Sequence, residues 1–363
     1  MRVGMPRRIL DRHVGGNTTY ARSLAGQLRD RGHTVGGFGG LGHPLANTVR
    51  ETAAGIRSTE LDLVHYVADT GPLVRTRVPS VVTVHGVASR WIDTGRTPMA
   101  ERIWRTRVAR AIDSCDRIIT VSQASAIDVA EVFDVDPNRI DVIYHGIEHT
   151  GIEHTGIEHT GIEHTETEGP APAQTDENDP PVRTTIRDLD DYILYLGNLE
   201  PRKNVTALIR AMADVPAGVT LVIAGKPAWA ADAIMAEIAN SPRVVHLGFV
   251  SDSEREHLMR HCRLFVFPSR YEGFGLPVLE ALAHGCPVLC SRRGALAEVA
   301  GPAFELAEID ESAIAAGITD ALAAVADDDT RTRLADAGRD WARQFNWQRS
   351  AEAHLAVYEE LLT

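Results

Sequence analysis

The stretch from residue 264 to residue 287 constrains the fold of this chain more than any other. It begins with four apolar residues typical of a buried strand, continues through the turn Glu272-Gly-Phe-Gly-Leu276, and ends in a helical segment. Pro277 suits the first turn of a helix, where a missing N–H group costs nothing, and Gly285 suits its end. A glycine-rich turn that leads into a helix presents backbone N–H groups at the positive end of the helix dipole. The sequence therefore predicts a phosphate-binding turn.

Two carboxylates bracket this turn. Glu272 precedes the glycines, and Glu280 lies about one helical turn beyond Pro277. The positions between the two carboxylates span at most about 12 Å, at a rise of roughly 1.5 Å per helical residue. This spacing fits a ligand in which phosphate joins two polar groups, one near each carboxylate.

Apolar runs typical of strands alternate with amphipathic helical segments along most of the chain. Strands are expected at residues 1–5, 61–67, 81–84, 117–122, 140–144, 192–196, 219–224, 244–247, 264–267 and 288–290. This alternation predicts an α/β fold with two Rossmann-like parallel-sheet domains that face each other across a cleft, where ligands of such sheets bind. We expect an N-terminal domain at residues 1–146, a C-terminal domain at residues 192–345, and a final helix at residues 346–363 that packs back on the first domain.

The segment between the predicted domains, residues 147–191, has an unusual composition. The pentapeptide Gly146-Ile-Glu-His-Thr150 is repeated without change through residue 165, and a stretch rich in Pro, Asp, Glu and Thr follows. A period of five matches neither a helix nor a strand, so regular structure does not gather the four histidines on one face. A metal-binding tract is one interpretation. Duplication of a surface segment is the interpretation we favour, and it predicts a flexible linker.

Composition excludes several classes of protein. A chain of 363 residues, 44% of them hydrophobic, is long enough for two domains with full cores. Apolar runs are too short for a membrane span, and the first residues lack the apolar core of a secretion signal. The four cysteines have no metal-type spacing, so we expect reduced, buried thiols and a cytoplasmic location.

The charges are unevenly distributed along the chain. The formal net charge is −13, yet residues 1–120 hold 18 arginines against 10 acidic residues, a balance of +8. Lysine occurs only at Lys203 and Lys226 among the 37 basic residues. An acidic, lysine-poor chain is typical of a high-salt cytoplasm and predicts a halophilic, haloarchaeal protein, although a GC-rich genome alone also favours arginine over lysine.

A set of short motifs, in this order and on the predicted elements, resembles the retaining glycosyltransferases of family GT4, which have the GT-B fold. The resemblance covers the chain apart from the repeat and the linker. The motif segments are residues 15–16, 85, 121–125, 145–147, 197–204, 224–225, 247–248, 268–280, 298–299 and 345–347.

The resemblance implies a role for each matching position. Arg202 and Lys203 would hold the donor diphosphate, Glu280 the nucleotide ribose and Glu272 the donor sugar hydroxyls, while His85 would reach the sugar near the reacting carbon. The remaining donor-binding positions are Gly16, Gly248, Gly273, Phe274, Gly275 and Leu276, the last four through backbone amides. Neither a cofactor nor a divalent metal is implied. One position departs from the pattern, because many relatives carry arginine where this chain has Asn198.

The resemblance implies a nucleotide-sugar donor and a glycan, glycolipid or lipid-linked acceptor, without nucleic acid as a partner. The arginine-bearing helix expected at residues 98–112 suits peripheral contact with anionic lipid on the cytoplasmic membrane face. The alternative is a core-packed helix with a solvated basic face. Three functions remain open, namely retaining glycosyl transfer, epimerisation of a sugar nucleotide on the same fold, and non-catalytic binding of a nucleotide sugar. The intact set of implied site residues favours the first.

Deletion of residues 151–165 is expected to leave glycosyl transfer intact, because the first copy of the repeat already supplies the His-Gly-Ile step that ends the N-terminal domain. The measurement is the transfer rate of the deletion variant against that of the full chain. A loss of more than about tenfold, roughly 1.4 kcal/mol in activation free energy, would contradict the prediction.

Overall fold

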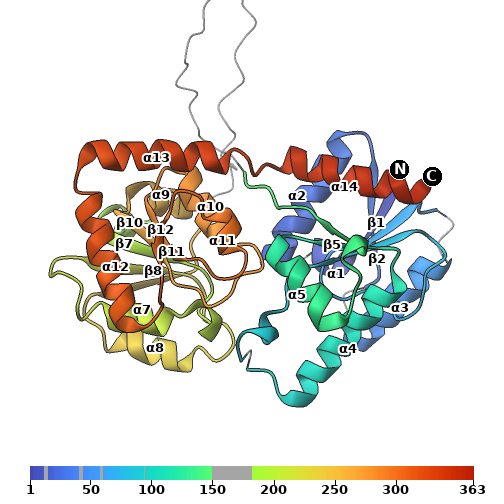
Figure 1. The fold of residues 1–363 in the computed structure, drawn as a ribbon, viewed down its shortest axis with the longest axis horizontal. Helices are drawn as coiled ribbons and strands as arrows, with labels where there is room; N and C mark the ends of the chain where they lie inside the picture. Colours follow the sequence, from blue (N-terminus) through green and yellow to red (C-terminus); the bar gives the residue numbers. More distant parts are fainter. Residues whose placement is uncertain (12–14, 41–43, 58–59, 94, 149–181) are drawn as a thin grey trace, which may run out of the picture.

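The computed structural model describes residues 1–11, 15–40, 44–57, 60–93, 95–148 and 182–363. The three later copies of the repeat and most of the predicted linker lie outside the described residues. Two parallel sheets of six strands each form two neighbouring domains (Figure 1). The predicted fold class, α/β with two Rossmann-like domains, is confirmed.

The N-terminal sheet has the strand order β2-β1-β3-β4-β5-β6. Its strands are β1 (Arg2–Pro6), β2 (Thr34–Phe38), β3 (Leu63–Tyr66), β4 (Ser80–Val84), β5 (Arg117–Thr120) and β6 (Ile140–Val142). Its helices are α1 (Arg7–Leu10), α2 (Gly16–Asp30), α3 (Pro44–Arg57), α4 (Pro98–Ser114) and α5 (Gln123–Phe133). Successive strand residues point to opposite faces, so Val81 packs in the apolar cluster of α2 while Val82 packs in that of α4. Both faces of this sheet are therefore buried.

The C-terminal sheet has the strand order β12-β11-β10-β7-β8-β9. Its strands are β7 (Tyr192–Leu196), β8 (Thr220–Ala224), β9 (Val244–Gly248), β10 (Leu264–Phe267), β11 (Val288–Ser291) and β12 (Phe304–Leu306). Its helices are α6 (Thr184–Arg187), α7 (Val205–Ala211), α8 (Asp232–Ala239), α9 (Asp252–His261), α10 (Leu276–Ala283), α11 (Leu296–Val299), α12 (Glu311–Ala324) and α13 (Asp328–Ala342). In each sheet the strand order reverses beside the first strand, at β1/β3 and at β7/β10, which is where open α/β sheets bind ligands.

The chain crosses between the domains twice, and the two crossings touch. Ile147 N donates to Phe345 O at 3.1 Å, and a Cβ on Gly146 would overlap the backbone of Asn346 and Trp347. Glycine is therefore required at this point of the crossing. Beyond it, α14 (Trp347–Leu362) runs along the N-terminal domain beside α2, where Tyr358 is fully buried (Figure 1).

Several stretches differ from the sequence-based expectation, among them the short edge strand β12, which was not predicted. Residues 182–191, assigned to the flexible linker, pack on the C-terminal domain, because Ile186 is buried in its core and Arg183 pairs with Glu254 at 2.5 Å. The edge strand β2 was not predicted, because two glycines in Thr-Val-Gly-Gly-Phe weaken its apolar signal. Helix α4 is only in part the core-packed helix considered above, because it buries Val108 and Ile112 but leaves Met99 and Ile103 exposed.

The turn after β10 rests directly on the N-terminal domain. The carbonyl oxygen of Gly273 accepts hydrogen bonds from the hydroxyl groups of Ser122 (2.9 Å) and Ser125 (3.2 Å). The hydroxyl of Tyr271 donates to Asp128 Oδ2 at 2.8 Å and accepts from Val87 N at 3.2 Å. These partners lie after β4 and on α5 from its N-cap Ser122 to Asp128, so the carboxyl ends of the two sheets face each other.

A second contact between the domains uses the start of α5 as well. The carboxylate of Glu298 accepts from the backbone N–H groups of Gln123 (2.9 Å) and Ala124 (2.7 Å) and from the hydroxyl of Tyr144 (2.8 Å). A carboxylate at a helix N-terminus is stabilised by unpaired N–H groups and by the helix dipole. Glu298 therefore fastens α11 of one domain to α5 of the other.

The substitution Gly273→Ala is expected to open the molecule, because a Cβ at this position would overlap the carbonyl oxygen of His85. Small-angle scattering should show a larger radius of gyration than for the wild type. Gly26→Ala is the matched control, since a Cβ on Gly26 meets no atom within 4 Å. Equal radii for the wild type and Gly273→Ala would contradict the closed arrangement.

Candidate active site

The two predicted phosphate-binding cations converge on one buried carboxylate. Glu272 is 5% exposed, and its oxygens accept from Arg202 Nη1 at 2.8 Å, Lys203 Nζ at 2.5 Å and Ser269 Oγ at 2.6 Å. Arg202 also donates from Nη2 to Glu200 Oε1 at 2.5 Å. The loops after β7 and β10, which are neighbouring strands, bring these groups together. The predicted contact of Glu272 with donor sugar stays a prediction.

The protonation of Glu272 follows from this arrangement. Burial alone would raise the pKa of its carboxyl group, because an ion is poorly solvated in the interior. The positive charges of Arg202 and Lys203 outweigh burial and lower the pKa to about 2. Glu272 is therefore an anion throughout the physiological pH range.

His85 lies at the end of β4 within a group of aromatic rings. Its Nε2 is 2.9 Å from the carbonyl oxygen of Val67, which can only accept, so Nε2 carries a proton and donates to it. Tyr20 meets its ring edge-on at 5.1 Å between centroids, and His145 stacks on it at 5.5 Å. Burial lowers the pKa of His145 well below its ordinary value, so a neutral ring faces His85.

The glycine-rich turn and the start of α10 lie as the sequence predicts. Helix α10 begins at Leu276 with Gly275 as its N-cap, at φ 107°, and no side chain caps it. The carbonyl of Gly273 is used by the N-terminal domain, as described above. Phe274 is buried, with its ring 4.7 Å from that of His145. The amides of the turn therefore start a helix at the boundary between the domains.

The other predicted donor-binding residues occupy three further elements. Glu280 on α10 has an Oε2 3.7 Å from Arg255 Nη1, and burial raises the pKa of its carboxyl group although Arg255 acts in the opposite direction. Gly16 opens α2, and a Cβ there would meet no atom within 4 Å. Gly248 ends β9 and accepts from Gly225 N at 2.7 Å. Among the described residues, no atom lies within 4 Å of a Cβ built on Gly248 either.

Sequence reasoning missed a cavity between the domains. It measures about 430 Å³ and is lined by Ala88, Gly95, Arg96, Glu200, Arg202 and Trp229. Only Arg202 of these had been singled out. The others lacked a signal because the two halves of the lining are more than 100 residues apart, although an exposed tryptophan in a loop after a strand is an available clue.

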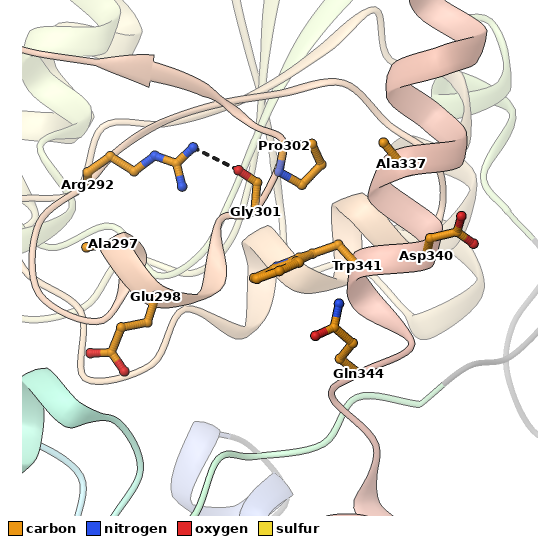
Figure 2. Close-up of a pocket in the computed structure, with 9 residues that line it drawn as sticks. All are labelled: Arg292, Ala297, Glu298, Gly301, Pro302, Ala337, Asp340, Trp341 and Gln344. Atoms are coloured by element: carbon orange, nitrogen blue, oxygen red, sulfur yellow. Dashed lines mark hydrogen bonds between the residues drawn. The ribbon is translucent and has the colours of Figure 1, made fainter.

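A larger cavity of about 560 Å³ lies elsewhere in the C-terminal domain, along α11 and α13 (Figure 2). Trp341 lines it and donates to Val299 O at 2.9 Å, while Arg292 donates to Gly301 O at 3.0 Å. Glu298 borders the cavity and contacts α5, as described above. None of the predicted site residues lines it.

Two further observations concern metals and membranes. Within the described part of the chain, there is no group of three or more His, Cys, Asp or Glu side chains that could hold a metal ion. In the same residues, every helix is too short or too polar to cross a bilayer. The expectation that catalysis needs no divalent metal stays a prediction.

Comparison with known proteins gives the family. The family model for group 1 glycosyl transferases matches residues 177–341, and the model for glycosyltransferase family 4 matches residues 38–150. The chain is 30% identical over 345 residues to the MMP alpha-(1->4)-mannosyltransferase of Mycolicibacterium hassiacum. The aligned residues make up 88% of this chain and 76% of the relative. The chain therefore belongs to the glycosyltransferases of group 1 and family 4.

Further relatives and solved structures agree with this placement. The chain is 36% identical over 178 residues to the O-antigen chain mannosyltransferase B of Escherichia coli. The aligned residues make up 47% of this chain and 46% of the relative. The chain thus spans about half the length of that relative. The fold matches Anabaena HepE in complex with UDP and glucose (TM-score 0.69, 18% identity, 99% and 100% covered). It also matches sucrose-phosphate synthase from Thermosynechococcus elongatus (TM-score 0.74, 17% identity, 99% and 98% covered). These likenesses show the GT-B fold.

Glu272→Gln is expected to lower the free energy of unfolding by about 3 kcal/mol at pH 7, because it leaves two buried cations without their shared anion. The folded pKa of about 2 lies below the ordinary value of 4.5, so the contribution is complete above pH 4.5 and is lost as the pH falls toward 2. Urea unfolding from pH 7 to pH 3 should show the difference between wild type and variant shrinking with acidity. Glu359→Gln, at an exposed site, is the control. A difference that stays constant with pH would contradict the assignment.

Proposed function

We propose that this protein transfers a hexosyl unit from a nucleotide-sugar donor to a glycan, glycolipid or lipid-linked acceptor, with retention of the anomeric configuration. The observation that carries the proposal is the position of Ser125. Its hydroxyl lies 3.4 Å from the carbonyl oxygen of His85 and 3.2 Å from that of Gly273. The end of β4 and the glycine-rich turn thus meet at one side chain, which brings His85 beside the predicted donor-binding turn.

Arg202 and Lys203 would stabilise the departing nucleoside diphosphate. In the structure they are neutralised by Glu272 and Glu200. A diphosphate placed beside them competes with these carboxylates for charge-assisted hydrogen bonds, which are the strongest in a dry site. The carboxylates therefore balance the two cations, and the leaving group gains these cations as its charge develops. This supply of positive charge supports the proposal that transfer needs no divalent metal.

The reaction exchanges one bond at the anomeric carbon of the donor. The bond from this carbon to the phosphate oxygen breaks, and the bond to the acceptor hydroxyl oxygen forms. The hydroxyl proton passes to the leaving phosphate, on the face of the sugar where that phosphate departs. His85 would contact the sugar from the N-terminal domain, with its ring held in place by the hydrogen bond from Nε2 to Val67 O. Glu280 on α10 would hold the ribose.

The relatives guide the choice of donor. Two of them are named as mannosyltransferases, and HepE was solved with UDP and glucose. Mannosyl and glucosyl nucleotides are therefore the first donors to test. Helix α4 supports peripheral membrane contact for a lipid-linked acceptor, because it exposes Met99 and Ile103 beside Arg102.

Thermal unfolding in molar KCl against UDP-, GDP-, ADP- and dTDP-sugars is expected to single out one nucleotide family. A ligand at a hundredfold excess over its Kd stabilises the folded state by about 2.7 kcal/mol. Glu280→Ala and Lys203→Ala should lose this stabilisation. In the double variant Lys203→Ala/Glu272→Gln both members of the buried ion pair are removed, so it separates loss of ligand binding from the cost of an unpaired buried charge. The exposed variant Glu359→Gln should be stabilised by the ligand like the wild type.

Turnover completes the test. The wild type should release nucleoside diphosphate from the selected donor in step with transfer to an acceptor, and NMR of the product should show the donor's anomeric configuration. Nucleoside diphosphate production without transfer, or an inverted product, would contradict retaining transfer. If all the nucleotide sugars fail to stabilise the protein at millimolar concentration, the donor site itself is misassigned.

A further inference from the structure

We propose that Tyr20 is a positioning residue for His85, and that helix α14 holds Tyr20 in place through a chain of buried hydrogen bonds. The inference rests on the proposed function, because it concerns the histidine that would contact the donor sugar. Tyr20 lies on α2 and is fully buried. Its ring stands nearly perpendicular to that of His85, with 5.1 Å between the centroids.

Hydrogen bonds between buried side chains connect Tyr20 to two strands and to α14. Its hydroxyl lies 2.7 Å from Nε2 of His354 on α14 and 2.9 Å from the hydroxyl of Thr83 on β4. The hydroxyl of Thr83 is also 2.7 Å from Nε2 of His65 on β3. Nδ1 of His65 is 2.6 Å from the hydroxyl of Tyr358 on α14. The chain of bonds thus leaves α14 at Tyr358, crosses β3, β4 and α2, and returns to α14 at His354.

A backbone carbonyl sets the direction of these bonds. Nδ1 of His354 is 2.7 Å from the carbonyl oxygen of Ser350, which can only accept, so Nδ1 carries a proton. Burial lowers the pKa of His354 to about 4, so the ring is neutral at pH 7 and its Nε2 accepts from Tyr20. Thr83 must then donate to Tyr20 and accept from His65, whose pKa burial also lowers. One arrangement of protons therefore satisfies the chain, and the Tyr20 hydroxyl has a single orientation.

The fixed ring of Tyr20 completes the set of contacts around His85. The backbone N–H of His85 donates to Asp69 Oδ1 at 2.8 Å, and its Nε2 donates to Val67 O. His145 stacks on the ring of His85 at 5.5 Å between centroids, and Tyr20 lies 4.8 Å from the ring of His145. Tyr20 therefore packs against both rings of a stacked pair. A catalytic side chain is held precisely only when the residues that pack on it are themselves fixed.

Tyr20→Phe keeps this ring but removes the hydroxyl that fixes it. With the donor and acceptor of the turnover assay, kcat should fall by about fivefold or more, because a displaced His85 supports the transition state less well. The KM for the donor should change by less than about twofold, since the lost effect belongs to the transition state.

Tyr358→Phe is the matched control. It also removes a fully buried hydroxyl that bonds to a histidine of the chain, but it leaves both hydrogen bonds of Tyr20 in place. Its kcat should stay within about twofold of the wild type. Equal losses of kcat in the two variants would mean that the chain of bonds only stabilises the fold.

Two variants of His354 separate orientation from stability. His354→Leu removes the acceptor of the Tyr20 hydroxyl and should lower kcat as Tyr20→Phe does. His354→Gln offers an amide oxygen as acceptor and should restore part of kcat. Urea unfolding gives the stability of all four variants. Losses of kcat that follow the losses of stability, rather than the loss of a bond to Tyr20, would contradict the positioning role.

NMR of the histidine rings tests the inference without turnover. The chain has 15 histidines, and His85→Gln identifies the resonances of His85 in protein labelled with carbon-13 histidine. Tyr20→Phe should move these resonances further than Tyr358→Phe does. Resonances of His85 that stay in place in Tyr20→Phe, or that move equally in both variants, would overturn the inference. The expected movement in a protein whose wild type transfers no sugar would keep the positioning role and reject the proposed function.

Discussion

The carboxylate of Glu272 holds together two neighbouring loops of the C-terminal domain, which carry most of the predicted site residues. Lys203 and Arg202 reach it from the loop after β7, and Ser269 reaches it from the loop after β10. A buried ion is tolerated only when charges and hydrogen bonds replace its hydration, and removing one partner of such a group typically costs about 3–5 kcal/mol. The ionic contact therefore fixes the position of the turn that starts at Glu272, and with it the start of α10.

The position of this glycine-rich turn also decides how the two domains meet. Gly273 lacks a side chain, so its backbone can lie against the carbonyl oxygen of His85. Its own carbonyl and the carboxylate of Glu298 both point at the beginning of α5, where unpaired N–H groups and serine hydroxyls donate to them. Hydrogen-bond acceptors of the C-terminal domain are thus gathered at the positive end of one helix of the N-terminal domain. The same element that is expected to bind donor phosphate also sets the domain closure.

The sequence was a good guide where a local signal exists and a poor one where it does not. Strand β10 is a continuous apolar run and β4 is rich in valine, and the glycine turn with Pro277 marks the start of α10 within one residue. The pairing of Glu272 with Arg202 joins residues 70 positions apart, and only the neighbouring placement of β7 and β10 reveals it. The cavity at Trp229 depends on two domains at once. Residues 182–191 look like linker by composition, yet one buried isoleucine and one ion pair hold them to the core.

The placement of lysine shows the demands of the site overriding the composition of the chain. Arginine is strongly preferred elsewhere, but Lys203 is buried, with its ammonium group 2.5 Å from Glu272 and 4.8 Å from the centroid of the Phe267 ring. A guanidinium group in this space would bring five donors, most of which would lack acceptors, and each unpaired donor costs about 1–3 kcal/mol. A compact ammonium group needs only the carboxylate and the face of the ring. The other lysine, Lys226, also lies over a phenylalanine, Phe249, at 4.3 Å. Both lysines follow strands of the C-terminal domain, and in both the compact ammonium group lies over an aromatic ring.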